Sequence, residues 1–354
     1  MAYEIKEGKE LVIRAGLELL KTGLIARTWG NISARISDTQ FVITPSGRAY
    51  DALTPDDIVV VNIADCSYEG SVKPSSEKGV HAAAYRNRPD VNFVIHTHQN
   101  YASAISALRV ALASGVVDPD SMSILGRRVP AAEYGISSTK KLTKAVETAI
   151  VSNGDSRAVL MVNHGTLCMG KDYEDAFAIA HKLEDVAKLR FESLCGTLLP
   201  GEADAEHIGE HEEVIGKLEG RYGDIYTDET IGCAILSRAP FTLAISKTGK
   251  TMKPYIDDMA QIGGVDTKCL PENASMEQIR KALKGRHAVL IENVGALCVS
   301  PAEDDARAVC TVLEKNAMAA LLKEAGDSPK AVDPISAFLE HTIYEKKYSK
   351  LKKQ

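Results

Sequence analysis

The sequence predicts an α/β fold in which helices cover both faces of a sheet, followed by a shortened second copy of the same pattern. Segments with the apolar character of strands are interleaved with segments that have the 3.6-residue spacing of helices, which is the order of a layered α/β protein. The stretch 158–184 also recurs without a gap at 288–314. Because internal repeats mark duplicated folding units, we expect two domains, residues 1–200 and 201–354.

The first part of the chain predicts one helix and three strands. Apolar residues recur at helical spacing over residues 6–21, and Gly23 follows as a helix stop. The segments 29–36, 41–44 and 58–62 are rich in β-branched or alternating apolar residues. Because they are closely spaced along the chain, they predict an antiparallel sheet.

Further along, helices and strands alternate more regularly. The sequence Pro74-Ser75-Ser76-Glu77 predicts the start of a helix that runs to Tyr85, because proline suits a first turn and serine caps one. An acidic segment, 201–206, is the predicted linker between the domains. The remaining predicted elements are the strand 90–97, the helices 101–108 and 138–151, the strand 158–163 and the helix 173–194.

Composition excludes several classes of function. The 354 residues carry a formal net charge of −6, so no basic field indicates nucleic-acid binding. No run approaches the roughly 20 apolar residues of a membrane span. Seven cysteines occur without a Cys-x-x-Cys pair, which argues against a disulfide framework or a zinc ribbon. We therefore expect a cytoplasmic protein that binds neither nucleic acid nor membrane.

Three histidines follow apolar, strand-like runs. His96 and His98 close the run that begins at Val94, and the two-residue period of a strand places them on the same face. His164 ends the second run, 158–163. Three neutral imidazoles leave a coordination position vacant, as in catalytic zinc sites. The alternative is that each is an ordinary core or surface histidine, which is our interpretation of His81.

Three short segments of the first domain are suited to bind an anion. They combine a flexible Gly-Asn pair, a tight turn that presents hydroxyl and N–H groups, and a pair of serines at a predicted helix N-terminus. Each alone is equally an ordinary turn or cap. The candidate phosphate-binding residues are Asn31, Ser46, Gly47, Ser75 and Ser76.

Glu77 follows the serine pair directly. Near a metal and a phosphate, its carboxylate is suited to ligate the ion or to move a proton. The alternative is a first-turn glutamate that stabilises the helix by its charge. In the second copy, Leu236, Arg238 and Val294 stand where the first has its three histidines. The first copy is thus predicted to carry the active site, and the second to keep only the scaffold.

The order and spacing of these motifs resemble the class II aldolase/adducin family, over residues 5–197 and in truncated form over the remainder. The resemblance rests on Gly30-Asn31, Thr44-Pro45-Ser46-Gly47, Pro74-Ser75-Ser76-Glu77, His96-Thr97-His98 and Asn163-His164-Gly165. It implies a three-layer α/β/α fold with a central, mainly antiparallel sheet, followed by a degenerate second copy that lacks the metal site.

For the site, the resemblance implies a zinc ion (Zn²⁺), or another divalent metal, held by His96, His98 and His164. Glu77 is the implied fourth ligand and catalytic acid/base. The implied reaction is retro-aldol cleavage of a phosphorylated deoxy-ketose, such as L-fuculose 1-phosphate, to dihydroxyacetone phosphate and an aldehyde. In this reaction the metal stabilises the enediolate left by carbon–carbon cleavage.

Other members of the family provide the alternatives. These are a sugar-phosphate 4-epimerase, a methylthioribulose-phosphate dehydratase and a non-catalytic adducin-like scaffold. Glu77 stands where the epimerase branch has aspartate, which favours an aldolase, and the retained histidines argue against a scaffold. The family also implies a homo-oligomer, a dimer or a tetramer, and a tyrosine as proton donor, for which Tyr134, Tyr344 and Tyr348 are the candidates.

Overall fold

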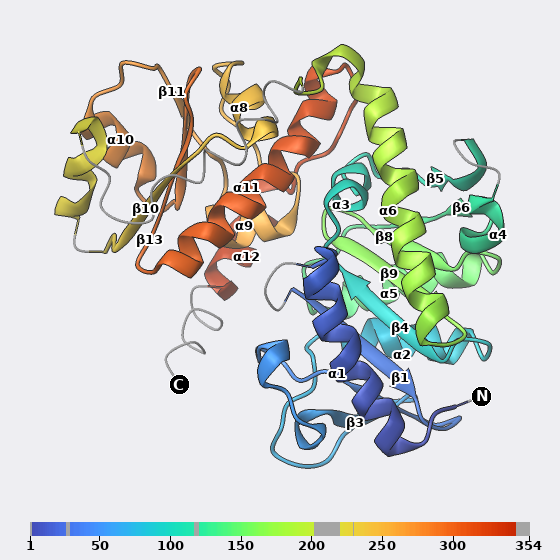
Figure 1. Cartoon of the computed structure of the whole chain (residues 1–354). Helices are drawn as coiled ribbons and strands as arrows, with labels where there is room; N and C mark the ends of the chain where they lie inside the picture. The colour runs from blue at the N-terminus through green and yellow to red at the C-terminus, as the bar shows by residue number, and fades with distance from the viewer. Residues whose placement is uncertain (1, 26–28, 117–119, 202–219, 229, 345–354) are drawn as a thin grey trace. The chain divides into compact units, whose positions relative to one another are not determined.

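The computed structural model describes residues 2–25, 29–116, 120–201, 220–228 and 230–344 (Figure 1). It divides into two compact units, residues 1–190 and 191–354, which are described separately. The boundary between them falls inside helix α6 (Tyr173–Cys195). Apart from Gly201, the predicted linker 201–206 lies outside the described residues.

The first unit is built on one seven-stranded sheet. Every neighbouring pair of its strands is antiparallel except β7 and β8, which are parallel. This confirms the prediction of a mainly antiparallel central sheet. In spatial order the strands are β3 (Val59–Asn62), β2 (Gln40–Ile43), β1 (Gly30–Arg35), β4 (Phe93–Thr97), β9 (Gly165–Gly170), β8 (Ala158–Met161) and β7 (Ala131–Ala132).

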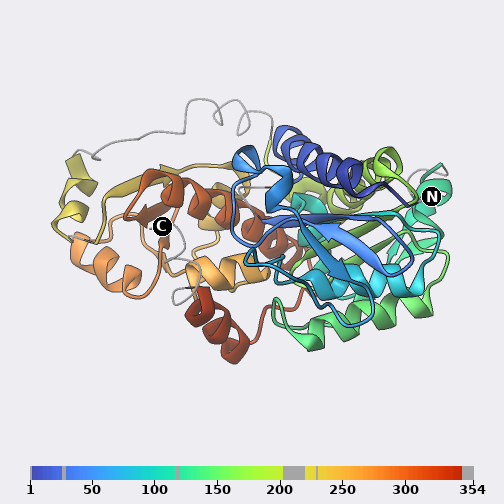
Figure 2. The same ribbon diagram turned by 90° about the horizontal axis from the view of Figure 1, so that it is seen from below.

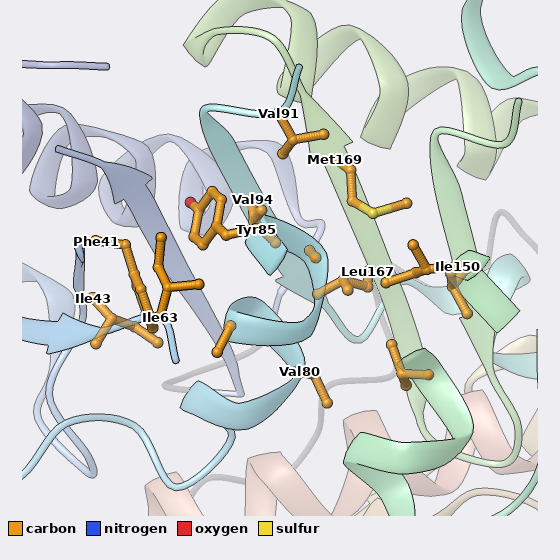
Figure 3. Packing of buried hydrophobic residues seen from close by; sticks show 14 of the residues in the cluster. Phe41, Ile43, Ile63, Val80, Tyr85, Val91, Val94, Ile150, Leu167 and Met169 are labelled. Carbon is orange, nitrogen blue, oxygen red and sulfur yellow. The ribbon is translucent and has the colours of Figure 1, made fainter. Parts of the chain in front are cut away.

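Helices cover both faces of this sheet. Figure 2 shows α1 (Ile5–Thr22) and α6 on one face, and α2 (Lys78–Asn87) and α5 (Lys140–Ser152) on the other. The core between the sheet and the pair α2 and α5 is apolar and buried (Figure 3). Because both faces are covered, the central strands read as nearly continuous apolar runs. The residues labelled in the figure are Phe41, Ile43, Ile63, Val80, Tyr85, Val91, Val94, Ile150, Leu167 and Met169.

A smaller layer connects β4 to β7. Helix α3 (Asn100–Ser106) follows β4, and β5 (Leu112–Ala113) then pairs with β6 (Arg128–Val129) in a separate two-stranded sheet. The short helix α4 (Ser121–Leu125) lies between these two strands in the sequence. The sequence pattern did not define the part of this region that follows α3, since none of its elements there exceeds five residues.

The start of α2 differs from the prediction. The helix begins at Lys78 rather than at Pro74, because the residues before it pair with a distant turn. Pro74 forms an isolated antiparallel bridge with Pro45, and the Ser75 N–H donates to the carbonyl oxygen of Thr44 at 2.9 Å. This pairing places two of the predicted anion-binding segments side by side.

The second unit contains a four-stranded sheet that repeats the central strand pairing of the first. Its strands are ordered β10 (Cys233–Ser237), β13 (Gly295–Ser300), β12 (Ala288–Ile291) and β11 (Cys269–Leu270), and β11 and β12 are the parallel pair. Its helices are α8 (Pro240–Ser246), α9 (Asp257–Gly263), α10 (Met276–Leu283), α11 (Glu303–Glu324) and α12 (Pro334–Ile343). Among its described residues, no strand corresponds to β1, β2 or β3.

The similarity of the two units extends to individual hydrogen bonds. In the first unit Glu184 accepts the backbone N–H groups of Tyr101 and Ala102, at 2.8 and 3.0 Å. In the second, Glu314 accepts those of Phe241 and Thr242, at 2.8 and 2.7 Å. The register also agrees, because each pair of positions in the β8–β9 ladder has its counterpart 130 positions later in the β12–β13 ladder.

None of the described helices has the length and apolar character needed to cross a bilayer.

Candidate active site

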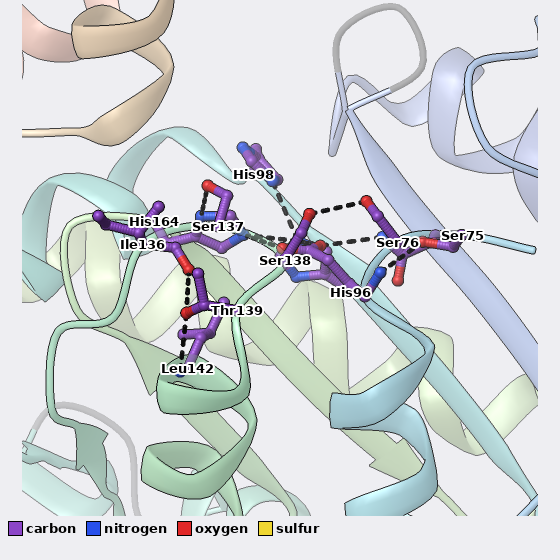
Figure 4. Close-up of polar contacts among 12 residues, drawn as sticks. Ser75, Ser76, His96, His98, Ile136, Ser137, Ser138, Thr139, Leu142 and His164 are labelled. Atoms are coloured by element: carbon purple, nitrogen blue, oxygen red, sulfur yellow. Dashed lines mark hydrogen bonds and ion pairs between the residues drawn. The ribbon is translucent and has the colours of Figure 1, made fainter. Parts of the chain in front are cut away.

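Three buried imidazoles converge at one end of the central sheet (Figure 4). His96 lies on β4 and His98 just beyond it, on the face that is covered by α2 and α5. His164 comes from the turn between β8 and β9. The Nε2 atom of His96 is 3.0 Å from that of His98 and 3.1 Å from that of His164.

The hydrogen bonds of His96 define its tautomer. Its Nδ1 lies 2.8 Å from the carbonyl oxygen of Thr166, and a carbonyl oxygen only accepts, so Nδ1 is the donor. In the neutral ring Nε2 therefore carries the lone pair. That lone pair faces two further ring nitrogens within hydrogen-bonding distance, and such a convergence of nitrogen ligands is suited to a cation.

Glu77 completes the set as a carboxylate. Its Oε2 lies 3.1 Å from His96 Nε2, and its Oε1 lies 3.1 Å from His164 Nε2. Oε1 is buried and accepts no hydrogen bond within the described chain. Burial alone would raise the pKa of Glu77, but the ion pairs with His164 and His96 outweigh it and hold the pKa well below its ordinary value. An anionic oxygen and three imidazole nitrogens at these distances fit a bound divalent cation.

His81 and Asn31 fix the carboxylate in place. The amide Nδ2 of Asn31 donates to Glu77 Oε2 at 3.1 Å, which leaves its Oδ1 to accept from His81 Nε2 at 2.5 Å. His81 Nδ1 is then the acceptor for the Ser33 hydroxyl, at 2.6 Å. Burial and the charge of His96 lower the pKa of His81 to about 3, so this imidazole is neutral. The sequence suggested no partner for His81, whereas the structure shows that it orients Asn31.

The predicted anion-binding residues come together next to Glu77. The Ser75 hydroxyl accepts the Glu77 N–H at 3.2 Å, and Ser46 donates its N–H to the carbonyl of Lys73 at 3.0 Å. Gly47 follows with φ +73°, a conformation that favours glycine and opens the turn. Figure 4 shows Ser75 and Ser76 near the imidazoles. The structure thus brings the metal-type and anion-type segments into one site.

A loop that the sequence did not single out lies over the same site. The Ser137 hydroxyl is 3.4 Å from His164 Nδ1, and the Ser138 hydroxyl donates to Ser76 Oγ at 2.7 Å (Figure 4). In the sequence, Ser137, Ser138 and Thr139 indicate only a helix cap, and Thr139 does cap α5 by accepting the N–H of Leu142. No local signal revealed the contacts with His164 and Ser76.

The three candidate tyrosines have different positions. Tyr134 is partly buried, with the guanidinium of Arg109 5.9 Å from its ring centroid. Arg109 also donates to the side-chain oxygen of Asn163 at 2.9 Å, next to His164 in the chain. Tyr344 is the last described residue, and Tyr348 lies outside the described part.

The described part of the chain contains no comparable cluster outside this site. Within the described ranges, His96, His98 and His164 form the one group of three or more His, Cys, Asp or Glu residues whose ligand atoms lie close enough together to hold an ion. In the second unit the equivalent sequence positions carry Leu236, Arg238 and Val294.

Known proteins of one family are similar to this chain. The family model described as Class II Aldolase and Adducin N-terminal domain matches residues 10–191 and again residues 221–321. A 5-deoxy-D-ribulose 1-phosphate aldolase of Bacillus thuringiensis serovar kurstaki is 32% identical over 220 residues, which cover 62% of this chain and 98% of that protein. An L-fuculose phosphate aldolase of Escherichia coli K12 is 33% identical over 186 residues, 52% of this chain and 83% of that protein.

A solved structure of L-fuculose 1-phosphate aldolase is 32% identical, covers 56% of this chain and 92% of its own, and superposes with a TM-score of 0.49. The family model covers most of the chain, in two ranges that fall largely in the two structural units. The chain therefore belongs to the class II aldolase and adducin N-terminal domain family, and its relatives identify it as an enzyme of the aldolase type, a carbon–carbon lyase.

Proposed function

We propose that this enzyme cleaves a phosphorylated ketose to dihydroxyacetone phosphate and an aldehyde by a metal-dependent retro-aldol reaction. The observation that carries the proposal is the position of Glu77, which lies 3.1 Å from two of the three converging imidazoles and directly follows the serine pair. The names of the two aldolase relatives support a ketose 1-phosphate as the substrate class.

His96, His98 and His164 would hold Zn²⁺ or another divalent ion, with Glu77 as the fourth ligand. When bound, such an ion supplies Lewis-acid stabilisation of the negative charge that develops on the substrate oxygens. The donation from His96 Nδ1 to the carbonyl of Thr166 fixes this ring with Nε2 free to bind. Three imidazoles and one carboxylate are the donor set that zinc prefers.

The chain's own acid/base group in this proposal is Glu77. Its carboxylate, which lies 3.1 Å from the Nε2 atoms of His96 and His164, would accept a proton and return one to the substrate carbon after the bond is broken. Asn31 binds its Oε2, and His81 in turn binds Asn31, so rotating the carboxylate away from Asn31 breaks a buried hydrogen bond. These contacts orient the proton carrier before the substrate binds.

The phosphoryl group would bind where the polar side chains of the bridged segments gather. The Pro45–Pro74 bridge preorganises these segments before the substrate arrives, so binding does not have to order them. The proposed phosphate-binding residues are Asn31, Ser46, Gly47, Ser75 and Ser76.

The test is a substrate panel on the zinc-loaded enzyme. L-fuculose 1-phosphate, 5-deoxy-D-ribulose 1-phosphate and L-ribulose 5-phosphate are incubated separately, and release of dihydroxyacetone phosphate is followed with a reducing coupling enzyme. We expect release from at least one ketose 1-phosphate and its loss when the metal is removed. Epimerised or dehydrated product without triose phosphate would contradict the proposal and favour the other activities of the family.

We also propose that residues 201–354 are a degenerate second copy of the catalytic domain, 1–200, and that the enzyme forms a homo-oligomer. The conserved pairing of Glu184 and Glu314 with the helix that follows β4 or β10 supports the duplication. Light scattering of the purified protein tests the second part: a dimer or tetramer is expected, and a monomer at micromolar concentration would contradict it.

A further inference from the structure

Ser138 has a backbone conformation that serine rarely adopts. Its φ is +64°, in the left-handed region where a side chain crowds the following carbonyl and glycine is favoured. Strained residues of this kind persist where the surrounding structure holds them, and they cluster at functional sites. In the first unit three described non-glycine residues with positive φ border the site or contact its residues: Arg109, Ser138 and Asn163.

The surrounding structure holds Ser138 firmly. The N–H of Thr139 donates to the carbonyl of Ile136 at 3.2 Å, and its hydroxyl donates to the same oxygen at 2.6 Å. Just before this turn, Gly135 lies so close to α5 that an added Cβ would come within 2.6 Å of the Leu142 nitrogen. The residues on either side of Ser138 are therefore held against the first turn of α5, and the exposed Ser138 side chain projects from this loop.

That position places the Ser138 hydroxyl against the serine pair. It donates to Ser76 Oγ at 2.7 Å across 62 residues of sequence (Figure 4). A serine hydroxyl carries one proton and accepts through its lone pairs. The hydrogen bond from Ser138 therefore helps to hold the Ser76 side chain next to Glu77.

We propose that Ser138 is a positioning residue for recognition of the substrate's phosphoryl group. It acts through Ser76, by holding that side chain in place beside an anion bound next to Glu77, and so contributes to the preference for phosphorylated over unphosphorylated ketose. This inference rests on the proposed function. The neighbouring contact of Ser137 with His164 joins the same loop to the imidazole side of the site.

Two substitutions separate the hydroxyl from the backbone strain. Ser138→Ala removes the hydroxyl and keeps a side chain in the left-handed conformation, whereas Ser138→Gly removes the hydroxyl and relieves the strain. Asn293→Gly is the matched control, because Asn293 is exposed, has φ +61° and lies in the turn of the second unit that corresponds to Asn163. Thermal unfolding of all three variants reports the strain separately from function.

The functional readouts are binding of inorganic phosphate to the zinc-loaded enzyme by calorimetry, and kcat and KM for L-fuculose 1-phosphate and for L-fuculose. One hydrogen bond corresponds to about a fivefold change in affinity. We expect both Ser138 variants to bind phosphate about fivefold more weakly and to raise KM for the phosphorylated ketose, with kcat within about twofold of wild type. KM for L-fuculose should not change, and Asn293→Gly should match the wild type.

The outcomes separate this inference from the proposed function. If the wild type cleaves a phosphorylated ketose but both Ser138 variants bind phosphate as it does, the role of Ser138 is wrong and the proposed function stands. If the wild type cleaves none of the substrates yet binds phosphate in a Ser138-dependent way, the inference stands and the proposed function fails. A wild type that binds no phosphate overturns the inference.

Discussion

Replacing Glu77 with glutamine separates the charge of this side chain from its shape. The carboxylate lies 3.1 Å from both His96 Nε2 and His164 Nε2, and Asn31 donates to its Oε2 at 3.1 Å. A glutamine keeps an oxygen to accept from Asn31 and places an amide nitrogen where the second oxygen was. The variant therefore retains the packing of the site but loses the negative charge and the group that carries the proton.

Loss of a general acid/base typically costs a factor of 10²–10⁴ in rate, which corresponds to about 3–5 kcal/mol of activation free energy. We expect kcat of Glu77→Gln to fall by about this factor, while elemental analysis still finds the metal, because the three imidazoles remain. Glu147→Gln is the control, since this carboxylate pairs with Arg86 on the outer side of α2 and α5. A kcat within about tenfold of the wild type, in a metal-loaded Glu77→Gln enzyme, would refute the role of Glu77.

Three further predictions follow from the same structure. Removing the metal with a chelator should abolish cleavage and lower the unfolding temperature, which calorimetry of both forms measures. If the ion is supplied at roughly 1,000 times its dissociation constant, its removal lowers the free energy of unfolding by up to about 4 kcal/mol. Burial raises the pKa of Glu314, so the contribution of this group to folding stability is present below pH 4.5 and is lost as pH rises through the higher pKa of the folded state. In denaturant titrations, the free energy of unfolding of Glu314→Gln should therefore depend less steeply on pH than that of the wild type, by at most about 1.4 kcal/mol per pH unit. The triple variant Leu236→His, Arg238→His and Val294→His should bind one additional zinc ion per chain by elemental analysis, and unchanged stoichiometry would argue against equivalence of the two units.

The placement of His96 and His98 was predictable because it depends on local geometry. The two-residue period of a strand places His96 and His98 on one face whatever the rest of the fold does. His164 follows an apolar run that is buried as a strand. The turn that carries it has φ +59° at Asn163, and the corresponding turn of the second unit has φ +61° at Asn293. The order of helices and strands follows from periodicity, and the enzyme class follows from motifs with fixed spacing. Both predictions were confirmed.

Other features depended on contacts between distant segments. Pro74 carries a correct local signal for a helix start, but pairing with Pro45 holds it extended, and the helix begins only at Lys78. The partners of His81 lie 48 and 50 residues away in the sequence, on β1, so no local pattern identifies them. Ser138 lacks even an indirect signal, because glycine or asparagine usually marks a left-handed position.

Anomalous scattering from crystals of the zinc-loaded enzyme would locate the ion among the imidazoles. We expect one strong peak in the first unit, about 2.0–2.1 Å from the Nε2 atoms of His96, His98 and His164, with Glu77 as the remaining protein ligand. A map with no peak among these three rings, or with zinc bound only elsewhere on the chain, would contradict this expectation.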